Sequence, residues 1–214
     1  MDKHSEVEIK FAADKVSLKD YHDFVASLTG EYIKPNGVCR IDRYKAVAGK
    51  DTYFVLAGQP LRFREGGDKE SELTYKQRKS AASIADRVEI NLPFKKGVGG
   101  FDVRALLGFL GAEEDFEIDK VSYIYHLTGQ TKTTTVEGHG QYTAVLALYD
   151  VTDEDGKTRR FLEVEIDAES SLCTPEIGLR VLDRWRKLIQ NRLKVKGPLN
   201  QSLYEIYTTK GKTK

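Results

Sequence analysis

The sequence has few of the residues that mark a metal finger or a disulfide scaffold. Only 2 of its 214 residues are cysteine, Cys39 and Cys173, and only 4 are histidine. The two cysteines have no ligand-type spacing to each other or to the histidines, so neither a zinc site nor a disulfide framework is indicated. The histidines are scattered, and none has a neighbouring Ser or Cys nucleophile that would indicate a catalytic triad.

Long apolar runs and an excess of one charge are also missing. No run approaches the ~18 residues of a membrane-spanning helix. The first residues, charged from Asp2 onward, lack the apolar core of a secretory signal. We therefore expect a cytoplasmic protein without a membrane partner. The 34 basic and 33 acidic residues give a net charge of +1, which argues against a stable nucleic-acid partner held by bulk electrostatics.

What the sequence does contain predicts one globular domain with mixed secondary structure. A hydrophobic content of 40% can build a substantial core, and we assign residues 1–208 to the domain and 209–214 to a basic tail. Helical spacing of apolar residues predicts helices at 18–29, 101–110, 175–193 and about 200–208. Short runs of alternating residues predict strands at 4–11, within 38–92, and at 120–127, 142–151 and 160–167.

Charged residues recur on one face of strand after strand. In Glu6-Val7-Glu8-Ile9-Lys10-Phe11 the charged and apolar residues alternate, so they point to opposite faces. Later strands repeat the pattern, and basic and acidic residues are sorted by strand. If the sheet closes into a barrel with these faces inward, its interior holds Glu6, Glu8, Lys10, Arg62, Arg64, Lys76, Arg78, Arg87, Glu89, Glu163 and Glu165.

Enclosing so many charges is unfavourable unless they stay hydrated or a ligand matches them. Clustered Arg and Lys suit a polyanion with several phosphates. Clustered carboxylates would repel that polyanion, but Mg²⁺ or Mn²⁺ can bridge carboxylate and phosphate oxygens. The pattern therefore predicts a metal–polyphosphate complex inside the barrel, whose apolar outer face is covered by amphipathic helices.

The order of these motifs resembles the CYTH superfamily, the triphosphate tunnel metalloenzymes. Its hallmark, Glu-x-Glu-x-Lys on the first strand, is met by residues 6–10. The resemblance covers nearly the whole chain and continues through Asp51-Thr52-Tyr53-Phe54, Leu61-Arg62-Phe63-Arg64, Thr74-Tyr75-Lys76, Arg87-Val88-Glu89, Phe161-Leu162-Glu163-Val164-Glu165 and Ser202-Leu203-Tyr204.

The resemblance implies an α+β fold, an antiparallel eight-stranded tunnel with helices packed outside, and a triphosphate-containing small molecule as partner. It implies that Mg²⁺ or Mn²⁺ is bound by Glu6, Glu8, Asp150, Glu163 and Glu165. It implies phosphate binding by Lys10, Arg62, Arg64, Lys76, Arg87 and Lys120, and strand parity adds Arg78. The residues expected to be catalytic are Glu6, Glu8 and Lys10. Glu89 could either bind the metal ion or pair with an arginine.

Two positions depart from the family pattern. Many members have another Asp where this chain has Val55, and members often carry Lys-x-Arg where it has Lys120-Val121-Ser122. The second departure removes one expected phosphate contact.

Three functions fit the resemblance: metal-dependent hydrolysis of a triphosphate compound, a class IV-type adenylate cyclase reaction, and non-catalytic capture of a nucleotide or polyphosphate. Cyclases of this family usually have a His-Phe pair before the first motif, whereas His4 is followed by Ser5. Hydrolysis of inorganic, nucleoside or thiamine triphosphate is therefore favoured. The sequence is compatible with either a monomer or a homodimer.

Overall fold

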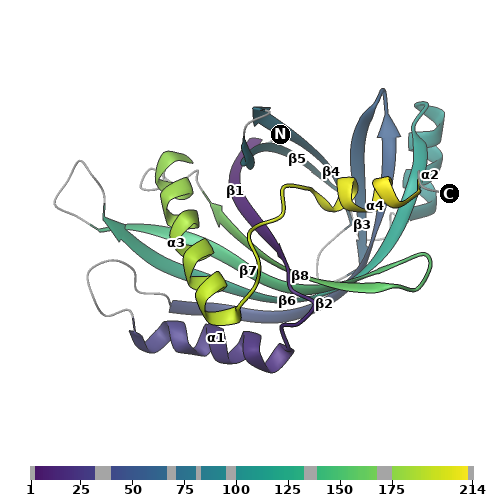
Figure 1. Cartoon of the computed structure of the whole chain (residues 1–214). Helices are drawn as coiled ribbons and strands as arrows, with labels where there is room; N and C mark the ends of the chain where they lie inside the picture. The colour runs from purple at the N-terminus through teal and green to yellow at the C-terminus, as the bar shows by residue number, and fades with distance from the viewer. Residues whose placement is uncertain are drawn as a thin grey trace.

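The computed structural model describes residues 3–31, 40–66, 71–80, 83–94, 100–132, 139–167 and 175–211. Within these ranges the chain forms an α+β fold of eight strands and four helices (Figure 1). The strands are β1 (Lys3–Ala12), β2 (Arg40–Leu56), β3 (Gln59–Gly66), β4 (Glu72–Ser80), β5 (Ser83–Pro93), β6 (Glu113–Lys132), β7 (His139–Asp153) and β8 (Thr158–Asp167). The helices are α1 (Leu18–Glu31), α2 (Gly100–Phe109), α3 (Pro175–Leu193) and α4 (Leu203–Gly211).

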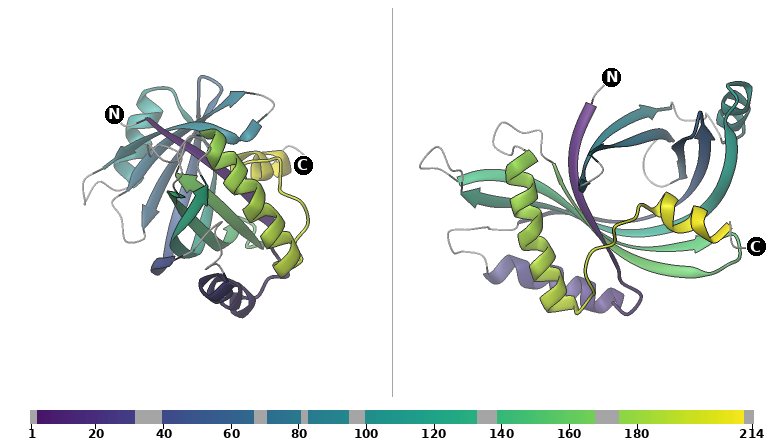
Figure 2. Two further views of the ribbon diagram at one scale, coloured as in Figure 1. Left: turned by 90° about the vertical axis from the view of Figure 1, so that its left-hand side faces the viewer. Right: turned by 45° about the horizontal axis from the view of Figure 1, so that its top comes forward.

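All strand pairs are antiparallel and form one strongly curled sheet. The hydrogen-bonded order is β1-β5-β4-β3-β2-β6-β7-β8. β1 pairs with β5 over Lys3–Val7 and with β8 over Glu6–Ala12, so the pairing returns to the strand where it began. The curl is visible in both views of Figure 2, where β1 crosses the sheet between the two strands that it joins.

One face of the sheet packs against α1 and α3 to form the main core. Val7 and Phe11 of β1 lie there with Leu146, Leu162 and other buried residues of β7 and β8. On α3, Val181, Leu182, Trp185 and Ile189 recur at helical spacing and are all buried, which gives this helix a continuous apolar stripe. Trp185 is the largest side chain of this stripe and only 3% of it is exposed, so it anchors the helix in the core.

Replacing Trp185 by Ala should lower the free energy of unfolding by about 3–5 kcal/mol, because it removes a large buried side chain and leaves a cavity. Leu179→Ala on the same helix is the matched control. Leu179 is 39% exposed, so its loss should cost below about 1 kcal/mol. Urea denaturation of both variants measures the difference, and equal losses would contradict the assignment of the core face.

The other two helices pack in smaller clusters. Val103 and Leu107 of α2 contact Phe54 and Phe63, and we call this group the α2 cluster. On α4, Leu203, Ile206 and Tyr207 pack against a set of residues that belong to β2, β6, β7 and β8, and we call this group the α4 cluster; its strand residues are Tyr53, Ile118, Tyr149, Val151 and Phe161.

The position of α4 corrects the expectation that all helices pack outside the sheet. Tyr149 and Phe161 occupy the face of β7 and β8 opposite to Leu148 and Leu162, which belong to the main core. α4 therefore covers the face that carries the charged residues, and Figure 1 draws it apart from α1 and α3. A sequence pattern reveals which helix face is apolar, but not which side of the sheet accepts it.

Most predicted elements lie where their sequence signals indicate. The turn at Asp155-Gly156 joins β7 to β8 between the strands predicted at 142–151 and 160–167, and Gly156 has a positive φ of 74° that favours glycine. β6 is much longer than the predicted 120–127, and α4 continues to Gly211, three residues into the predicted basic tail. In the described part of the chain, no helix has the length and apolar character required to cross a membrane.

Candidate functional site

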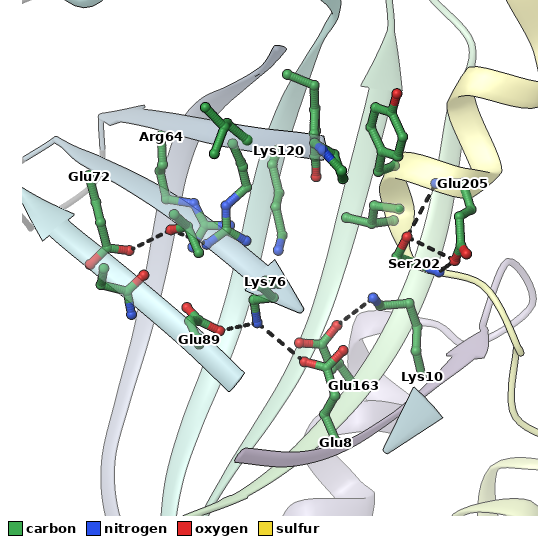
Figure 3. A pocket seen from close by; sticks show the side chains of 18 of the residues that line it. Glu8, Lys10, Arg64, Glu72, Lys76, Glu89, Lys120, Glu163, Ser202 and Glu205 are labelled. Atoms are coloured by element: carbon green, nitrogen blue, oxygen red, sulfur yellow. Dashed lines mark hydrogen bonds and ion pairs between the residues drawn. The ribbon is translucent and has the colours of Figure 1, made fainter. Parts of the chain in front are cut away.

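A cavity of about 550 Å³ lies on the charged face of the curled sheet. Side chains from β1 to β6, from β8 and from the beginning of α4 line it (Figure 3). Strand alternation explains this: Glu8 and Lys10 point into the cavity, whereas Val7 and Phe11, which flank the pair in the sequence, are buried in the main core. Most of the residues whose alternation was read from the sequence thus meet in one space.

Four carboxylates gather on the wall formed by β1, β8 and β5. Glu8 lies directly opposite Glu165 in the antiparallel register, and Lys10 lies opposite Glu163. Glu89 of β5 completes this acidic wall, which we define as Glu8, Glu89, Glu163 and Glu165. Antiparallel neighbours have Cβ atoms about 5 Å apart, so the carboxylates are close enough to influence one another.

Two lysines partly neutralise the acidic wall. Lys10 Nζ lies 3.1 Å from Glu163 Oε2, and Lys76 Nζ lies 3.5 Å from Glu8 Oε2. Lys76 also forms an ion pair with Glu89 (Figure 3). Glu8 is only 4% exposed, and a carboxylate with so little water requires such partners.

The carboxyl groups of Glu163 and Glu165 respond in opposite ways to this environment. Burial raises the pKa of Glu163, but the charges of Lys10, Lys120 and Lys76 outweigh it and hold that pKa well below its ordinary value. For Glu165, burial and the neighbouring charges of Glu163, Glu8 and Glu89 outweigh the opposing effect of Lys76 and raise the pKa to about 7. The acidic wall therefore carries more negative charge than its lysines neutralise.

Two arginines of β3 form a second, basic wall. Arg64 donates from Nε and Nη2 to the two carboxylate oxygens of Asp51, at 2.7 and 2.9 Å. Burial raises the pKa of Asp51, but the charge and hydrogen bonds of Arg64 outweigh it and hold that pKa well below its usual range. Arg62, two residues along the same strand face, donates from Nη2 to Thr74 Oγ1 at 3.0 Å. Asp51 is fully buried, so it fixes Arg64 in one orientation towards the cavity.

Lys120 enters the cavity from β6. Its Nζ lies 3.8 Å from the centroid of the Tyr149 ring, and Tyr149 donates from its hydroxyl to Glu163 Oε2 at 2.9 Å. Burial and the positive charges of Arg64 and Arg62 lower the pKa of Lys120 to about 7, although Asp51 and Glu163 act in the opposite direction. When Lys120 is protonated, the surrounding residues therefore do not fully compensate its charge.

This environment predicts that stability depends on pH through Lys120. Because its pKa is about 7 in the folded chain and about 10.4 in an unfolded one, the unfolded state binds more protons between these values. The free energy of unfolding should therefore rise as pH increases from 7 towards 10. Urea denaturation of wild type and Lys120→Met at several pH values would measure the slope, which the variant should lose.

Lys157→Met provides the control for that series. Lys157 is an exposed lysine in the turn between β7 and β8, so its removal should leave the pH slope unchanged. An unaltered slope in Lys120→Met would contradict a depressed pKa for Lys120.

The structure brings most of the residues singled out from the sequence into this cavity. Those that line it are Glu8, Lys10, Arg62, Arg64, Lys76, Glu89, Lys120, Glu163 and Glu165. For Glu6, Arg78 and Arg87 only the backbone is described: Glu6 pairs with Arg87 and Asp167, and Arg78 pairs with Arg87. Their side chains, like Cys39 and Cys173, lie outside the described part of the chain.

Asp150, expected as a fifth acid, is not part of this group. Arg160 donates from Nε and Nη2 to its two carboxylate oxygens, both at 2.7 Å. Arg160 also donates to the Val16 carbonyl oxygen at 2.8 Å, outside the cavity. Asp150 shares a strand face with Leu146 and Leu148 of the main core, so it points away from Glu163. Alternation along β7 contained this signal, but the assignment of Asp150 rested on the resemblance.

Sequence reasoning missed three side chains that shape the site. Asp51 was left without a role, because its pairing with Arg64 depends on the register between β2 and β3. Thr74 and Tyr149 are uncharged, so a search for alternating charges passes over them. Tyr149 nevertheless alternates with Leu148 and Asp150 in the way that indicates a cavity-side residue.

The acidic wall offers oxygen donors, the ligands that Mg²⁺ and Mn²⁺ prefer. Among the described side chains, no group of three or more His, Cys, Asp or Glu residues is arranged to hold a metal ion. Lysines occupy the positions nearest to Glu8, Glu89 and Glu163 instead.

Comparison with known proteins identifies a similar fold but no family. No protein-family model matches the chain, and no curated protein matches it. Among solved structures, it is similar to the PH1819 protein from Pyrococcus horikoshii OT3, with a TM-score of 0.61 and 18% sequence identity over 96% of this chain and 99% of that one. At this identity the similarity establishes the fold alone. A protein of unknown function from Bacteroides ovatus covers 57% of this chain, at 11% identity, but its TM-score of 0.15 supports no argument.

Proposed function

We propose that this chain binds a triphosphate compound together with Mg²⁺ or Mn²⁺ in the cavity and hydrolyses it. The observation that carries the proposal is the separation of charge: carboxylates gather on β1, β5 and β8, and guanidinium groups gather on β3. An anion alone would be repelled by the acidic wall, and a cation alone would be repelled by the arginines. A metal–triphosphate complex can interact favourably with both, because its metal ion binds carboxylates and its phosphates bind guanidinium groups.

The strand order supports a tunnel with these two walls on opposite sides. β4, β5 and β1 separate β3 from β8 in one direction, and β2, β6 and β7 separate them in the other. In a closed eight-stranded sheet such strands face one another. Arg62 and Arg64 would then reach one side of the phosphate chain while Glu163 and Glu165 act from the other.

The donor chemistry of the acidic wall fits a hard divalent cation. Burial and three neighbouring carboxylates raise the pKa of Glu165 to about 7, which is the signature of carboxylates that lack enough positive charge. Glu8, Glu163 and Glu165 would hold the ion, with Glu6 as a further ligand from the resemblance. When bound, the ion would neutralise phosphate charge and polarise a phosphoryl oxygen.

The side chains of the protein perform the remaining steps: they bind phosphate, stabilise charge and accept a proton. Arg62, Arg64 and Lys120 bind phosphate oxygens, and Asp51 keeps Arg64 oriented, so less side-chain freedom is lost on binding. Lys10 and Lys76 leave their carboxylate partners to stabilise negative charge on the terminal phosphate. A carboxylate of the acidic wall accepts a proton from the attacking water.

A second candidate function is capture of a polyphosphate without hydrolysis. The ion pairs of Lys10 with Glu163 and of Lys76 with Glu8 favour it, because in this arrangement lysines already supply part of the positive charge of the site. Among the described contacts, none favours a cyclase reaction in this way. Detection of cyclic AMP tests that reaction.

One experiment separates these functions. The purified protein is incubated with tripolyphosphate, ATP or thiamine triphosphate, each with Mg²⁺, with Mn²⁺ or with EDTA, and phosphate, pyrophosphate and cyclic AMP are quantified. Metal-dependent release of phosphate is the expected result. Tight binding without product would establish capture instead, cyclic AMP with pyrophosphate would establish a cyclase, and the absence of both binding and product would refute all three.

A further inference from the structure

The exposed side of α2 is apolar. Phe101 and Phe109 are 83% and 90% exposed, and Leu106 and Leu110 are 51% and 55% exposed. Together with Ala105, which is also exposed, we call these residues the α2 outer face. The helix lies at one edge of the molecule, against β3 and β6 and away from α1 and α3 (Figure 1).

The α2 outer face is separate from the side of the helix that packs on the sheet. That side, with Val103 and Leu107, belongs to the α2 cluster. None of the residues of the outer face belongs to a core cluster in the described part of the chain. A helix that is apolar on all sides is normally buried on all sides, so the outer face requires a covering surface that the described chain does not supply.

The area of the α2 outer face is large enough for a dimer interface. A phenylalanine presents about 200 Å² when it is free, so the two exposed rings and the half-exposed leucines add up to roughly 500 Å² of apolar surface. This is at the upper end of what monomers leave uncovered. Two such faces packed together would bury about 1,000 Å² in total, the size at which specific protein–protein interfaces begin.

The spacing of residues on the outer face is self-complementary. Phe101, Ala105 and Phe109 follow one another at intervals of four, so they lie along one line of the helix surface. The order Phe–Ala–Phe reads the same from either end. If a second α2 runs antiparallel to the first, each phenylalanine meets a phenylalanine and the alanines meet at the twofold axis. The small central residue allows the two helix backbones to approach closely.

Gly108 provides an independent reason to expect close approach at this face. It lies in α2, where glycine lowers helix stability relative to alanine. Its φ is not positive, and a Cβ added to it would meet no atom within 4 Å. Neither the backbone conformation nor packing within the described chain therefore requires glycine here. A second helix packed against α2 would require it.

The charges around the α2 outer face favour a protein over a membrane surface as its partner. The exposed charged residues of α2 and of the beginning of β6 are all acids, namely Asp102, Glu113, Glu114 and Asp115. Arg104 is tied to glutamates: its Nε lies 3.1 Å from Glu114 Oε2, and it also pairs with Glu117. Helices that bind anionic lipid surfaces carry Lys and Arg beside their apolar face instead.

We infer that the α2 outer face binds the same face of a second copy of this chain, which gives a twofold-symmetric homodimer with antiparallel α2 helices. No described residue of α2 lines the cavity. Both cavities therefore lie outside the interface, and the inference is independent of the proposed function.

Sedimentation velocity of the full-length chain, from low to high micromolar concentration, tests the inference. The wild type should reach about twice the mass of one chain, 24.2 kDa. Ala105→Glu places two like charges at the twofold axis and should weaken association by at least about 100-fold. Asn191→Glu, which adds the same charge at an exposed position of α3, is the control and should dimerise like wild type.

Mixing two charge variants tests the antiparallel arrangement itself. Ala105→Glu and Ala105→Arg should each be monomeric alone, because each repels its own copy. An equimolar mixture should form a heterodimer, because the opposite charges meet at the axis. Circular dichroism and thermal melting check that both proteins are folded. If Ala105→Glu melts early, Phe109→Glu, at a position that is 90% exposed, replaces it in the dimer measurement.

Three outcomes would overturn the inference. They are a wild type that stays monomeric at every concentration, a dimer that persists in folded Ala105→Glu, and a mixture of the two charge variants that stays monomeric. A wild type that is monomeric but floats with vesicles of phosphatidylcholine and phosphatidylserine, when Ala105→Glu does not, would assign the face to a membrane instead. Triphosphate hydrolysis is measured separately, so either proposal can fail while the other holds.

Discussion

Replacing Glu8 by Gln should reduce metal-dependent triphosphate hydrolysis by at least about 100-fold. Loss of a residue that only supports a metal ligand typically costs 10–100-fold, and Glu8 is proposed as a ligand itself. Gln keeps the shape and one oxygen but removes the charge. Because Glu8 is only 4% exposed and lies on a wall with excess negative charge, its replacement should leave the fold intact. Titration of activity with Mg²⁺ at saturating triphosphate measures the effect.

Asp150→Asn is the control for that experiment. The family resemblance assigns Asp150 to the metal, whereas the structure pairs it with Arg160 on the opposite face. We expect the Mg²⁺ dependence of this variant to match wild type, with a loss of about 1 kcal/mol in the free energy of unfolding because the ion pair is partly exposed. A Glu8→Gln protein that unfolds, as judged by circular dichroism, would instead assign a structural role to Glu8.

The second large effect concerns Arg64 and Asp51. Arg64→Met should both destabilise the fold by about 3 kcal/mol and weaken triphosphate binding by about 10–100-fold. The loss of stability arises from Asp51, which is 0% exposed and would remain buried without its guanidinium partner. The loss of affinity arises from the missing phosphate contact. Chemical denaturation and calorimetric titration with tripolyphosphate measure the two effects separately.

Arg62→Met is the matched variant, two residues away on the same strand face. Arg62 donates to Thr74 Oγ1, a neutral acceptor that loses much less when the arginine is removed. Binding should therefore weaken by a similar factor while the free energy of unfolding changes by less than about 1 kcal/mol. Equal destabilisation by both substitutions would show that the Asp51–Arg64 pair has no special part in the fold.

The predictable part of this site is the part that obeys strand alternation. Glu8, Lys10, Arg62 and Arg64 were assigned to one interior because charged and apolar residues alternate around them, and the cavity contains all four. The period of two along a strand is a local property of the backbone, so it can be read without knowledge of the fold. The sorting of acids and bases between strands could be read in the same way.

What could not be predicted depends on contacts between segments far apart in the sequence. The Asp51–Arg64 pair requires the register of β2 with β3, and the α4 cluster requires α4 to cross to the cavity side of the sheet. A short helix such as α4 has only a few apolar residues, and these do not specify which face of the sheet they will cover. Asp150 is the opposite case. The resemblance assigned it to the metal site, although the local alternation along β7 already placed it on the face away from the cavity.

The pairing of β1 with both β5 and β8 also determines when the site can form during synthesis. β1 leaves the ribosome before the other described strands, but one of its two partners, Thr158–Asp167, follows roughly 150 residues later. Such distant pairing is slow, because a long loop must close before any contact compensates for its lost entropy. Glu8 and Lys10 meet Glu165 and Glu163 only when this last pairing is complete. A nascent chain that ends before β8 therefore contains the glutamates and lysine of its first motif but no binding site.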